Sequence, residues 1–362
     1  MHMTKRLALL ALASLFLSAC SDDDRPAVDA GPDAMIDAGE EPIPLAWNTV
    51  VDGYEPGALF SGWAGGPDDV WLVGGERGKS VVLHFDGTSW ESMDPGLNEQ
   101  LWWVHGFPDG TVYVCGDRGA VARWDGSAWT QLDSGAPGTV FYGLWGAAPD
   151  DVWLVGGPTP TPATGVAPEG DVVLHFDGSA FERAQIQALI DKPASAQKNL
   201  FKVWGASADA VFIVGSSGLA LHYDGTSWEQ QATPVIGQAL FTVAGRSATD
   251  VYAVGGEGVP VLLHWDGAAW TEIALPASAP QAIQGVWTAP GEPVYLGGWY
   301  GFTAALSPGG NFTVTDTGSP LAYHAVFGDG GGSVWAVGGD IYALLPSYQG
   351  IILSTRDGVP TL

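Results

Sequence analysis

The chain has 362 residues, of which 46% are hydrophobic and 11% aromatic, and its formal net charge at pH 7 is −27. This length suits one large domain or two ordinary ones. A polyanion of this kind repels nucleic acid and anionic lipid headgroups, so the charge argues against nucleic acid as a partner.

The beginning of the chain is typical of an export signal. Lys5 and Arg6 precede an uncharged apolar stretch, residues 7–19, which is shorter than the ~20 residues that a membrane-spanning helix needs. The Leu-Ser-Ala-Cys run that ends at Cys20 resembles the lipobox of bacterial lipoproteins, which implies cleavage before this cysteine and lipid attachment to its thiol. We therefore predict a lipoprotein signal peptide over 1–19. An ordinary signal peptide followed by a chance cysteine is the alternative.

The segment after Cys20 is acidic and poor in large apolar side chains. It reads SDDDRPAVDAGPDAMIDAGEEPIP over residues 21–44. Such a segment buries too little surface to repay its ordering entropy, so we predict the lipidated cysteine and a flexible acidic linker over 20–46. By resemblance to Gram-negative sorting rules, Ser21 implies a lipid anchor in the outer membrane of a bacterial cell envelope. The side of the membrane that the protein faces is left open.

From residue 47 onward the sequence repeats. Each repeat offers four short segments rich in β-branched and aromatic residues, with Gly and Asp at the joins, which is typical of strands and turns. Four strands in about 40 residues is the period of a β-propeller blade. We predict an all-β fold over 47–362, a seven-bladed β-propeller of four-stranded antiparallel blades, with eight blades less favoured. Seven valines mark the repeats: Val70, Val112, Val152, Val211, Val251, Val294 and Val334.

The best repeats join a VWLVGG segment, from Val70, to a downstream HFDGTSW segment. This pairing resembles the kelch and galactose-oxidase type of propeller repeat, and partly the Asp-box repeats of sialidases. The resemblance covers residues 47–358 and implies an architecture, not a reaction. Ser307-Pro308 and Pro346-Ser347 replace Asp-Gly in the last two repeats. Tight hairpin turns are predicted at the Asp-Gly pairs that begin at Asp86, Asp125, Asp177, Asp224 and Asp266.

One strand has two possible sources. Residues 47–50 read WNTV and match WTQL at 129–132, the outer segment of the second repeat. An outer strand from the N-terminal side would complete the last blade and remove the exposed edges of an open ring. Residues 350–356 are the other candidate for this strand, and the sequence does not decide between them.

Residues that recur in the same place in several repeats are expected to serve the blades. Tryptophans recur as packing residues, and Cys115 aligns with strand valines, so we predict that it is a small buried side chain without a disulfide partner. We predict neither a metal site nor a cofactor. The histidines of one column are expected to be structural: His84, His175, His222 and His264.

Residues that depart from the repeat pattern are the candidates for a ligand site. The loops between the second and third strands of every blade open on one face of a propeller. Carboxylates, arginines and an aromatic pair on this rim suit a polar ligand such as a glycan or a peptide, whereas solvated turn residues are the alternative. The predicted rim residues are Glu76, Arg77, Asp117, Arg118, Glu257, Trp299 and Tyr300.

Two further features depart from the pattern. In the innermost-strand column of small residues, Trp103 and Lys202 are candidates to line the central channel, with gap-filling as the alternative. The insertions at 158–170 and 185–199 are either a lid or partner contact, or disordered flaps.

The sequence shows no nucleophile elbow, metal-ligand cluster or phosphate loop, so no catalytic residue is predicted. We favour a lipid-anchored, monomeric, non-enzymatic binding module for a protein or glycan ligand. An envelope enzyme that acts on polysaccharide through the same rim is one alternative. A scaffold that resembles the propeller lipoprotein of outer-membrane protein assembly is another.

Overall fold

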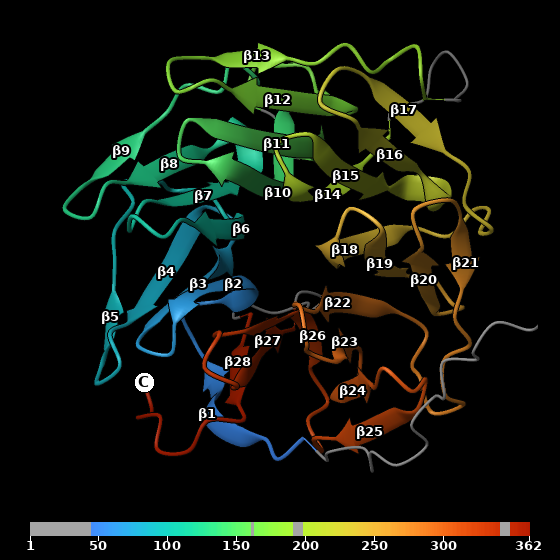
Figure 1. Ribbon diagram of the computed structural model, residues 1–362. Coiled ribbons are helices and arrows are strands. Elements are labelled where there is room, and N and C mark those ends of the chain that lie inside the picture. Colours follow the sequence, from blue (N-terminus) through green and yellow to red (C-terminus); the bar gives the residue numbers. More distant parts are fainter. Residues whose placement is uncertain (1–44, 161–162, 191–197, 341–347) are drawn as a thin grey trace, which may run out of the picture. The chain divides into compact units, whose positions relative to one another are not determined.

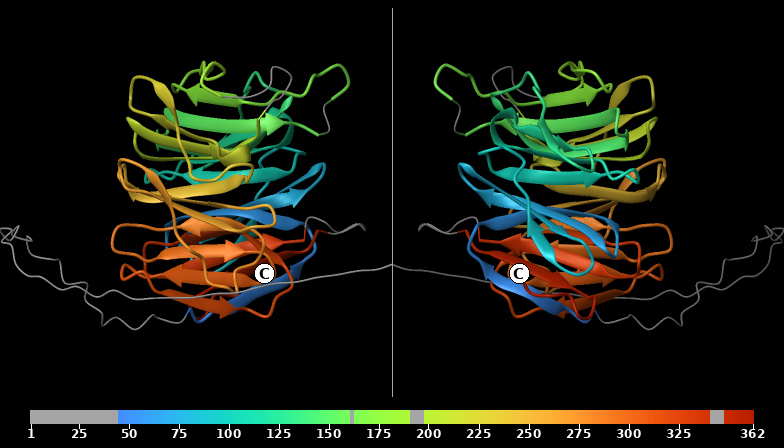
Figure 2. Two further views of the ribbon diagram at one scale, coloured as in Figure 1. Left: turned by 90° about the vertical axis from the view of Figure 1, so that its right-hand side faces the viewer. Right: turned by 90° about the vertical axis from the view of Figure 1, so that its left-hand side faces the viewer.

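The structure is a computed structural model, and it describes residues 45–160, 163–190, 198–340 and 348–362. The predicted signal peptide, Cys20 and almost all of the predicted linker lie outside the described residues, as do Pro346-Ser347 and parts of both insertions. The described residues form seven four-stranded antiparallel sheets, so the predicted seven-bladed propeller is confirmed. Figure 1 shows the blades around a common centre, and Figure 2 shows them from the side.

The first four blades each contain four strands in chain order, from the inner edge to the outer edge. Blade 1 contains β2 (Ala58–Gly66), β3 (Asp69–Glu76), β4 (Lys79–Phe85) and β5 (Trp90–Ser92). Blade 2 contains β6 (Leu101–Gly106), β7 (Val112–Gly116), β8 (Val121–Trp124) and β9 (Trp129–Gln131). Blade 3 contains β10 (Thr139–Ala148), β11 (Asp151–Pro158), β12 (Val172–Phe176) and β13 (Phe181–Arg183). Blade 4 contains β14 (Leu200–Ser207), β15 (Ala210–Gly215), β16 (Ala220–Tyr223) and β17 (Trp228–Gln231).

The last three blades follow the same plan until the ring closes. Blade 5 contains β18 (Leu240–Ser247), β19 (Asp250–Gly255), β20 (Val261–Trp265) and β21 (Trp270–Glu272). Blade 6 contains β22 (Ile283–Trp287), β23 (Val294–Gly298), β24 (Phe302–Leu306) and β25 (Phe312–Asp316). Blade 7 contains β26 (Ala322–Gly328), β27 (Val334–Gly339), β28 (Gly350–Ser354) and, as its outer strand, β1 (Asn48–Tyr54).

The ring is closed by strands from the two ends of the described chain. β1 pairs antiparallel with β28, so the N-terminal segment supplies the outer strand of blade 7, and residues 350–354 supply the third strand. This settles the choice that the sequence left open. Each inner strand contacts the inner strand of the next blade, and β26 of blade 7 contacts β2 of blade 1. Pairing the two ends in one sheet leaves no open edge between the first and last blades.

Helical structure is confined to two short 3₁₀ turns, η1 (Asp117–Gly119) and η2 (Ser216–Gly218), among the residues described. Within that same part of the chain, no helix has the length and apolarity to cross a membrane.

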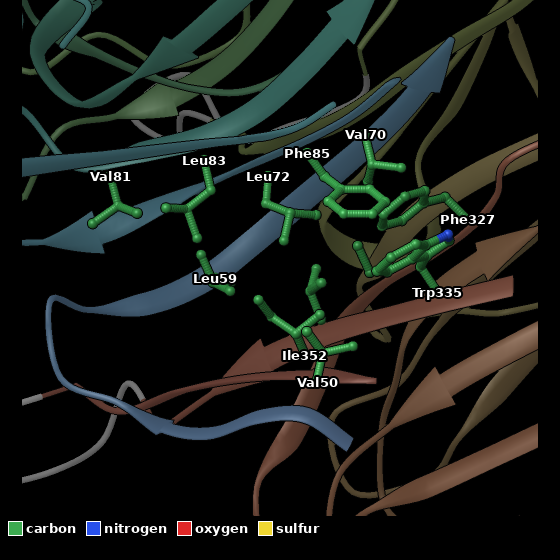
Figure 3. Close-up of a cluster of buried hydrophobic side chains, with 12 residues drawn as sticks. Val50, Leu59, Val70, Leu72, Val81, Leu83, Phe85, Phe327, Trp335 and Ile352 are labelled. Carbon is green, nitrogen blue, oxygen red and sulfur yellow. The ribbon is translucent and has the colours of Figure 1, made fainter. Parts of the chain in front are cut away.

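The core lies between the blades. Second strands are buried along their whole length in β7, β15 and β27, whereas the outer strands β5 and β9 are exposed at two of their three residues. Figure 3 shows the cluster where blades 7 and 1 meet, with Val50 of β1 and Trp335 of β27 among its side chains. The β-branched and aromatic residues of the repeat therefore hold neighbouring sheets together, as pleated surfaces packed on both faces require.

Tryptophans join successive blades in two ways. An inner-strand tryptophan covers a glycine of the next blade, as with Trp145 over Gly205 and Trp287 over Gly328. Trp129, which opens an outer strand, meets the second-strand Trp71 of the preceding blade edge to face, with ring centroids 6.1 Å apart. These contacts confirm the predicted packing role.

The repeated histidines are held within their own blades. His84 of β4 is the cross-strand partner of Trp71 on β3, with ring centroids 4.1 Å apart, and its Nε2 is 2.9 Å from Asp69 Oδ1. His175 and His264 repeat this arrangement with Asp151 and Asp250. The four histidines lie in four different blades and do not converge on one site, as the repeat pattern predicted.

The Asp-Gly turns are four-residue loops fastened by the aspartate. Between β4 and β5, Asp86 Oδ1 accepts the backbone N–H groups of Thr88 and Ser89, and Gly87 has φ +89°. These hydrogen bonds lower the pKa of Asp86 to about 2. The turn is therefore an Asx type, in which the side chain replaces a backbone acceptor.

Candidate functional site

Every inner strand contains a β-bulge near its beginning, at its second, third or fourth residue. In blade 1, Leu59 pairs with Gly74 and Ser61 pairs with Val73, so Phe60 has no partner on β3. A bulged residue is released from the pleat, and its side chain is aimed differently from those of its neighbours. The same register shift recurs in all seven blades, at Phe60, Trp102, Tyr142, Phe201, Phe241, Gln284 and His324.

These seven side chains, which we call the collar, surround the propeller axis. Their rings form a chain of contacts from His324 through Phe60, with centroids 5.1 Å apart, to Trp102, at 4.4 Å. The chain continues through Tyr142 and Phe201 to Phe241, with centroid separations of 5.2, 5.4 and 5.5 Å. Gln284 is the remaining member of the circle, so five of the seven blades contribute an aromatic ring of Phe, Tyr or Trp.

The collar lines an open cavity of about 250 Å³, together with Lys202 and Thr242. The collar residues lie at the beginning of the inner strands, which pair with the end of the second strands. The cavity therefore opens on the face that carries the loops between second and third strands, where the predicted rim residues lie.

The two predicted channel residues contact each other. Lys202 Nζ lies 3.6 Å from the centroid of the Trp103 ring, which is a cation–π distance, and it donates a hydrogen bond of 2.8 Å to the carbonyl oxygen of Tyr142. Lys202 lines the collar cavity, whereas Trp103 lines a second cavity of about 220 Å³ at the other mouth. The pair therefore separates two cavities along the axis.

Lys202 is buried, with 8% of its surface exposed. Removal from water lowers the pKa of its amine to about 7, and the neighbouring Cys115 thiol opposes this shift. Cys115 is itself fully buried and a free cysteine, as predicted, and burial raises the pKa of its thiol. The amine therefore titrates near neutral pH beside an apolar cavity.

Two collar members carry polar atoms without partners. Gln284 Oε1 and His324 Nε2 are buried and accept no hydrogen bond from the described residues. Burial lowers the pKa of His324 to about 4, and a hydrogen bond with the backbone of Gly339 opposes the shift. The imidazole is therefore neutral at pH 7. Unsatisfied buried acceptors are uncommon in native proteins and call for a partner.

One predicted rim residue is joined to the collar. Trp102 Nε1–H donates a hydrogen bond of 2.8 Å to Asp117 Oδ1. Burial raises the pKa of Asp117, while that hydrogen bond and the charges of Arg118 and Arg77 oppose the rise. Arg118 also pairs with Glu99 at 3.3 Å. The structure therefore brings together Arg77, Asp117 and Arg118 beside the collar, across blades 1 and 2.

Of the other predicted rim residues, Trp299, Tyr300 and Glu257 lie on blades 5 and 6, and Glu76 lies on blade 1. Trp299 and Tyr300 follow β23, and their rings meet edge to face at a centroid distance of 6.1 Å. They line a cavity of about 290 Å³ with Pro320, Leu321 and Asp340, and Tyr300 is 62% exposed. Glu257 lies in blade 5, where its backbone N–H donates to Gln238 Oε1. Glu76 ends β3 opposite Lys79.

The collar was not predicted, because the inner-strand column that contains Trp103 and Lys202 begins at Ser61, one residue after the collar position of blade 1. A signal was present in the chain: the residue before this column is aromatic in five repeats. A second signal was the glycine at or near the end of each second strand. A Cβ added to Gly74 would lie 2.0 Å from the carbonyl oxygen of Ala58, so this close approach at the bulge requires glycine.

The described residues contain no group of three or more His, Cys, Asp or Glu side chains placed to hold a metal ion. The chemistry that the collar offers is that of recognition: ring faces and edges, one amine, and two hydrogen-bond acceptors.

Comparison with known proteins identifies the fold alone. No family model and no curated protein matches the sequence. A catalytically inactive virginiamycin B lyase from Staphylococcus aureus, solved with quinupristin, has a TM-score of 0.66 at 10% identity and covers 86% of this chain and 99% of its own. YCF48 from Cyanidioschyzon merolae has a TM-score of 0.61 at 16% identity, covering 85% and 98%. The WD40 repeats of RRP9 have a TM-score of 0.62 at 8% identity, covering 86% and 98%. The chain therefore shares the β-propeller fold with these proteins.

Proposed function

We propose that this protein is a non-enzymatic binding module of the bacterial cell envelope, tethered to the outer membrane through a lipid on Cys20, and that it binds a protein ligand through the collar. The observation that carries the proposal is the bulge in all seven inner strands. It aims five aromatic rings at one cavity. Aromatic anchors in a central pocket dominate the binding energy of many interfaces.

The shape of the collar favours a protein side chain over a glycan. A sugar ring stacks on a flat, exposed aromatic face. Neighbouring collar rings are instead inclined to one another, at 36° for Phe60 and Trp102 and at 73° for Trp102 and Tyr142. A cavity of about 250 Å³ has the size to enclose one large side chain. The nearby Trp299 and Tyr300 cavity is the surface that would suit a glycan.

The β-propeller fold does not indicate which reaction, if any, a protein catalyses. The lyase named above shares the propeller, but folds of this kind carry unrelated functions, and an activity must be argued from its site. The collar holds no nucleophile paired with a base among the described residues, whereas its rings, amine and acceptors suit recognition.

Affinity capture with the full-length protein tests the proposal. Wild type, a collar variant (Phe201→Ala with Phe241→Ala) and a rim variant (Trp299→Ala with Tyr300→Ala) are immobilised and exposed to the same envelope extract. We expect the wild type and the rim variant to retain a set of proteins that the collar variant loses. A second collar variant with leucine at both positions preserves most of the packing volume. Loss of the proteins from this variant at an unchanged melting temperature assigns the loss to the collar rings and not to unfolding.

Two results would contradict the proposal. Equal recovery of proteins by all forms would exclude the collar as the binding surface. Selective loss of polysaccharide from the rim variant would instead indicate a glycan ligand at Trp299 and Tyr300.

The membrane tether has a separate test. Cys20→Ala removes the thiol that would carry the lipid, so we expect this variant to leave the membrane fraction while wild type stays in it. Cys115→Ala is the matched control, because its thiol is buried in blade 2. Continued sedimentation of the Cys20→Ala variant with membranes would rule out the lipid anchor.

A further inference from the structure

The collar cavity contains a buried amine that has no negative partner. Lys202 is 8% exposed, and its contacts within the described chain are the Tyr142 carbonyl and the Trp103 ring. None of the ion pairs among the described residues includes it. A buried charge is ordinarily paired, because taking it out of water is costly. The ammonium form has three N–H donors, so it has capacity for an acceptor that the chain does not supply.

Two other residues that line the same cavity carry buried acceptors. Gln284 Oε1 and His324 Nε2, on the neighbouring blades 6 and 7, have no donor among the described residues. The rings of Phe201 and Phe241, which contact each other, line this cavity as well. A ligand that satisfies all three features needs an anionic acceptor, an N–H donor and an apolar body.

From this arrangement we propose that the collar binds the free carboxylate of an apolar N-acylated amino acid, such as the last residue of a protein chain. The carboxylate pairs with Lys202, the amide N–H is offered to His324 or Gln284, and the apolar side chain packs on Phe201 and Phe241. This inference rests on the proposed function and specifies the chemistry of its ligand.

A cationic ligand fits less well, although aromatic rings attract cations. Burial, and to a lesser degree the charge of Lys202, lower the pKa of His324, so a second positive charge in the cavity is disfavoured. A purely apolar ligand would bury the amine and both acceptors without partners, which costs free energy at each group.

Calorimetric titration of the full-length protein at pH 6 tests the proposal with three probes. N-acetyl-L-phenylalanine has all the required groups. Its methyl ester lacks the carboxylate charge, and 3-phenylpropionate lacks the amide N–H. We expect the acid to bind at least about tenfold more tightly than the ester, since charged hydrogen bonds contribute about 1.5–3 kcal/mol. The acid should also bind more tightly than 3-phenylpropionate.

Two variants test whether Lys202 causes the preference for the acid over its methyl ester. Lys202→Met keeps an unbranched buried side chain and should abolish the preference for the acid over the ester. Lys79→Met, at an exposed lysine on β4, should leave that preference unchanged. Equal affinity for acid and ester in wild type, or a preference that survives in Lys202→Met, would overturn the proposal. Failure of the acid to bind wild type would do the same.

Two peptides distinguish the sources of the carboxylate. Acetyl-GSGSF with a free terminal carboxylate should bind more tightly than N-acetyl-L-phenylalanine if the ligand is a protein terminus, and the same peptide with a terminal amide should not bind. Tighter binding of the single amino acid would overturn the assignment to a protein terminus and indicate a small free ligand. If the acid fails to bind while protein capture still depends on the collar, this inference falls and the proposed function stands. If the acid binds through Lys202 while protein capture is independent of the collar, the proposed function falls and this inference about the Lys202 site stands.

Discussion

Lys202 places an amine where the equivalent inner-strand positions of the other blades have small or uncharged side chains. Its neighbours on blades 2 and 3 are Trp103 and the Tyr142 carbonyl, neither of which carries a negative charge. The titratable groups that face it are Cys115 on β7 and His324 on β26. Burial without a counter-charge therefore decides its protonation, and it lowers the pKa of the amine from 10.5 to about 7.

This shift predicts that Lys202 destabilises the free protein in a pH-dependent way. The unfolded chain keeps the proton up to about pH 10.5, whereas the folded protein releases it near pH 7. The free energy of unfolding of wild type should therefore rise with pH between these values. We expect Lys202→Met to be more stable than wild type at pH 6, by about 2–5 kcal/mol, and the gap to shrink by pH 10.

Urea unfolding of wild type and Lys202→Met at pH 6 and at pH 10 measures this gap. A difference in unfolding free energy that is the same at both pH values would show that the amine does not lose its proton on folding.

At the scale of the element, each inner strand both lines the axis of the propeller and packs against the next blade. A residue near its beginning bulges toward the axis, and a later tryptophan, such as Trp145 or Trp287, covers a glycine of the next blade. The hydrophobic pattern predicted the existence and order of the strands, but not the bulges. A bulge is defined by the register between two strands, and that register appears only once the strands are paired.

The contact between tryptophan and glycine predicts a position-specific cost. A Cβ added to Gly205 would lie 2.4 Å from Trp145 Cη2, so Gly205→Ala must displace the ring. Overpacking of this kind costs about 1–3 kcal/mol. Gly66→Ala, at the end of β2, is the matched control because its Cβ would meet no atom within 4 Å.

The midpoints of urea unfolding compare the two variants. We expect Gly66→Ala to remain within about 0.5 kcal/mol of wild type. Similar midpoints for Gly205→Ala and Gly66→Ala would mean that the Trp145 contact does not hold blades 3 and 4 together.

For the described ring as a whole, stability depends on closure. β1 contributes the outer strand of blade 7, and Val50 reaches the core between blades 7 and 1. Without this strand, β28 would present unpaired backbone groups along its edge, and part of that core would be exposed to water.

Two truncated forms test whether the outer strand β1 stabilises the ring. Removal of residues 1–54 deletes β1, and we expect the melting temperature to fall by about 5–10 °C and light scattering to rise. Removal of residues 1–44 leaves all 28 strands of the ring and should not change the melting temperature. Equal melting curves for the two truncated forms would show that the ring does not need its outer strand.

Periodicity and residue type alone determined the seven repeats and the four strands of each repeat, because each blade repeats the same local pattern of buried and turn positions. The same pattern predicted that Cys115 is buried and that the repeated histidines do not converge on one site. Three features were decided by the tertiary structure alone: the closure of the ring by β1, the contact between Lys202 and Trp103, and the collar. Symmetric copies on the outer strands diverge, so a repeated residue there serves its own blade. Copies on the inner strands converge on one axis. Residues such as Phe60 and Phe241, some 180 positions apart in the chain, can therefore form a single site.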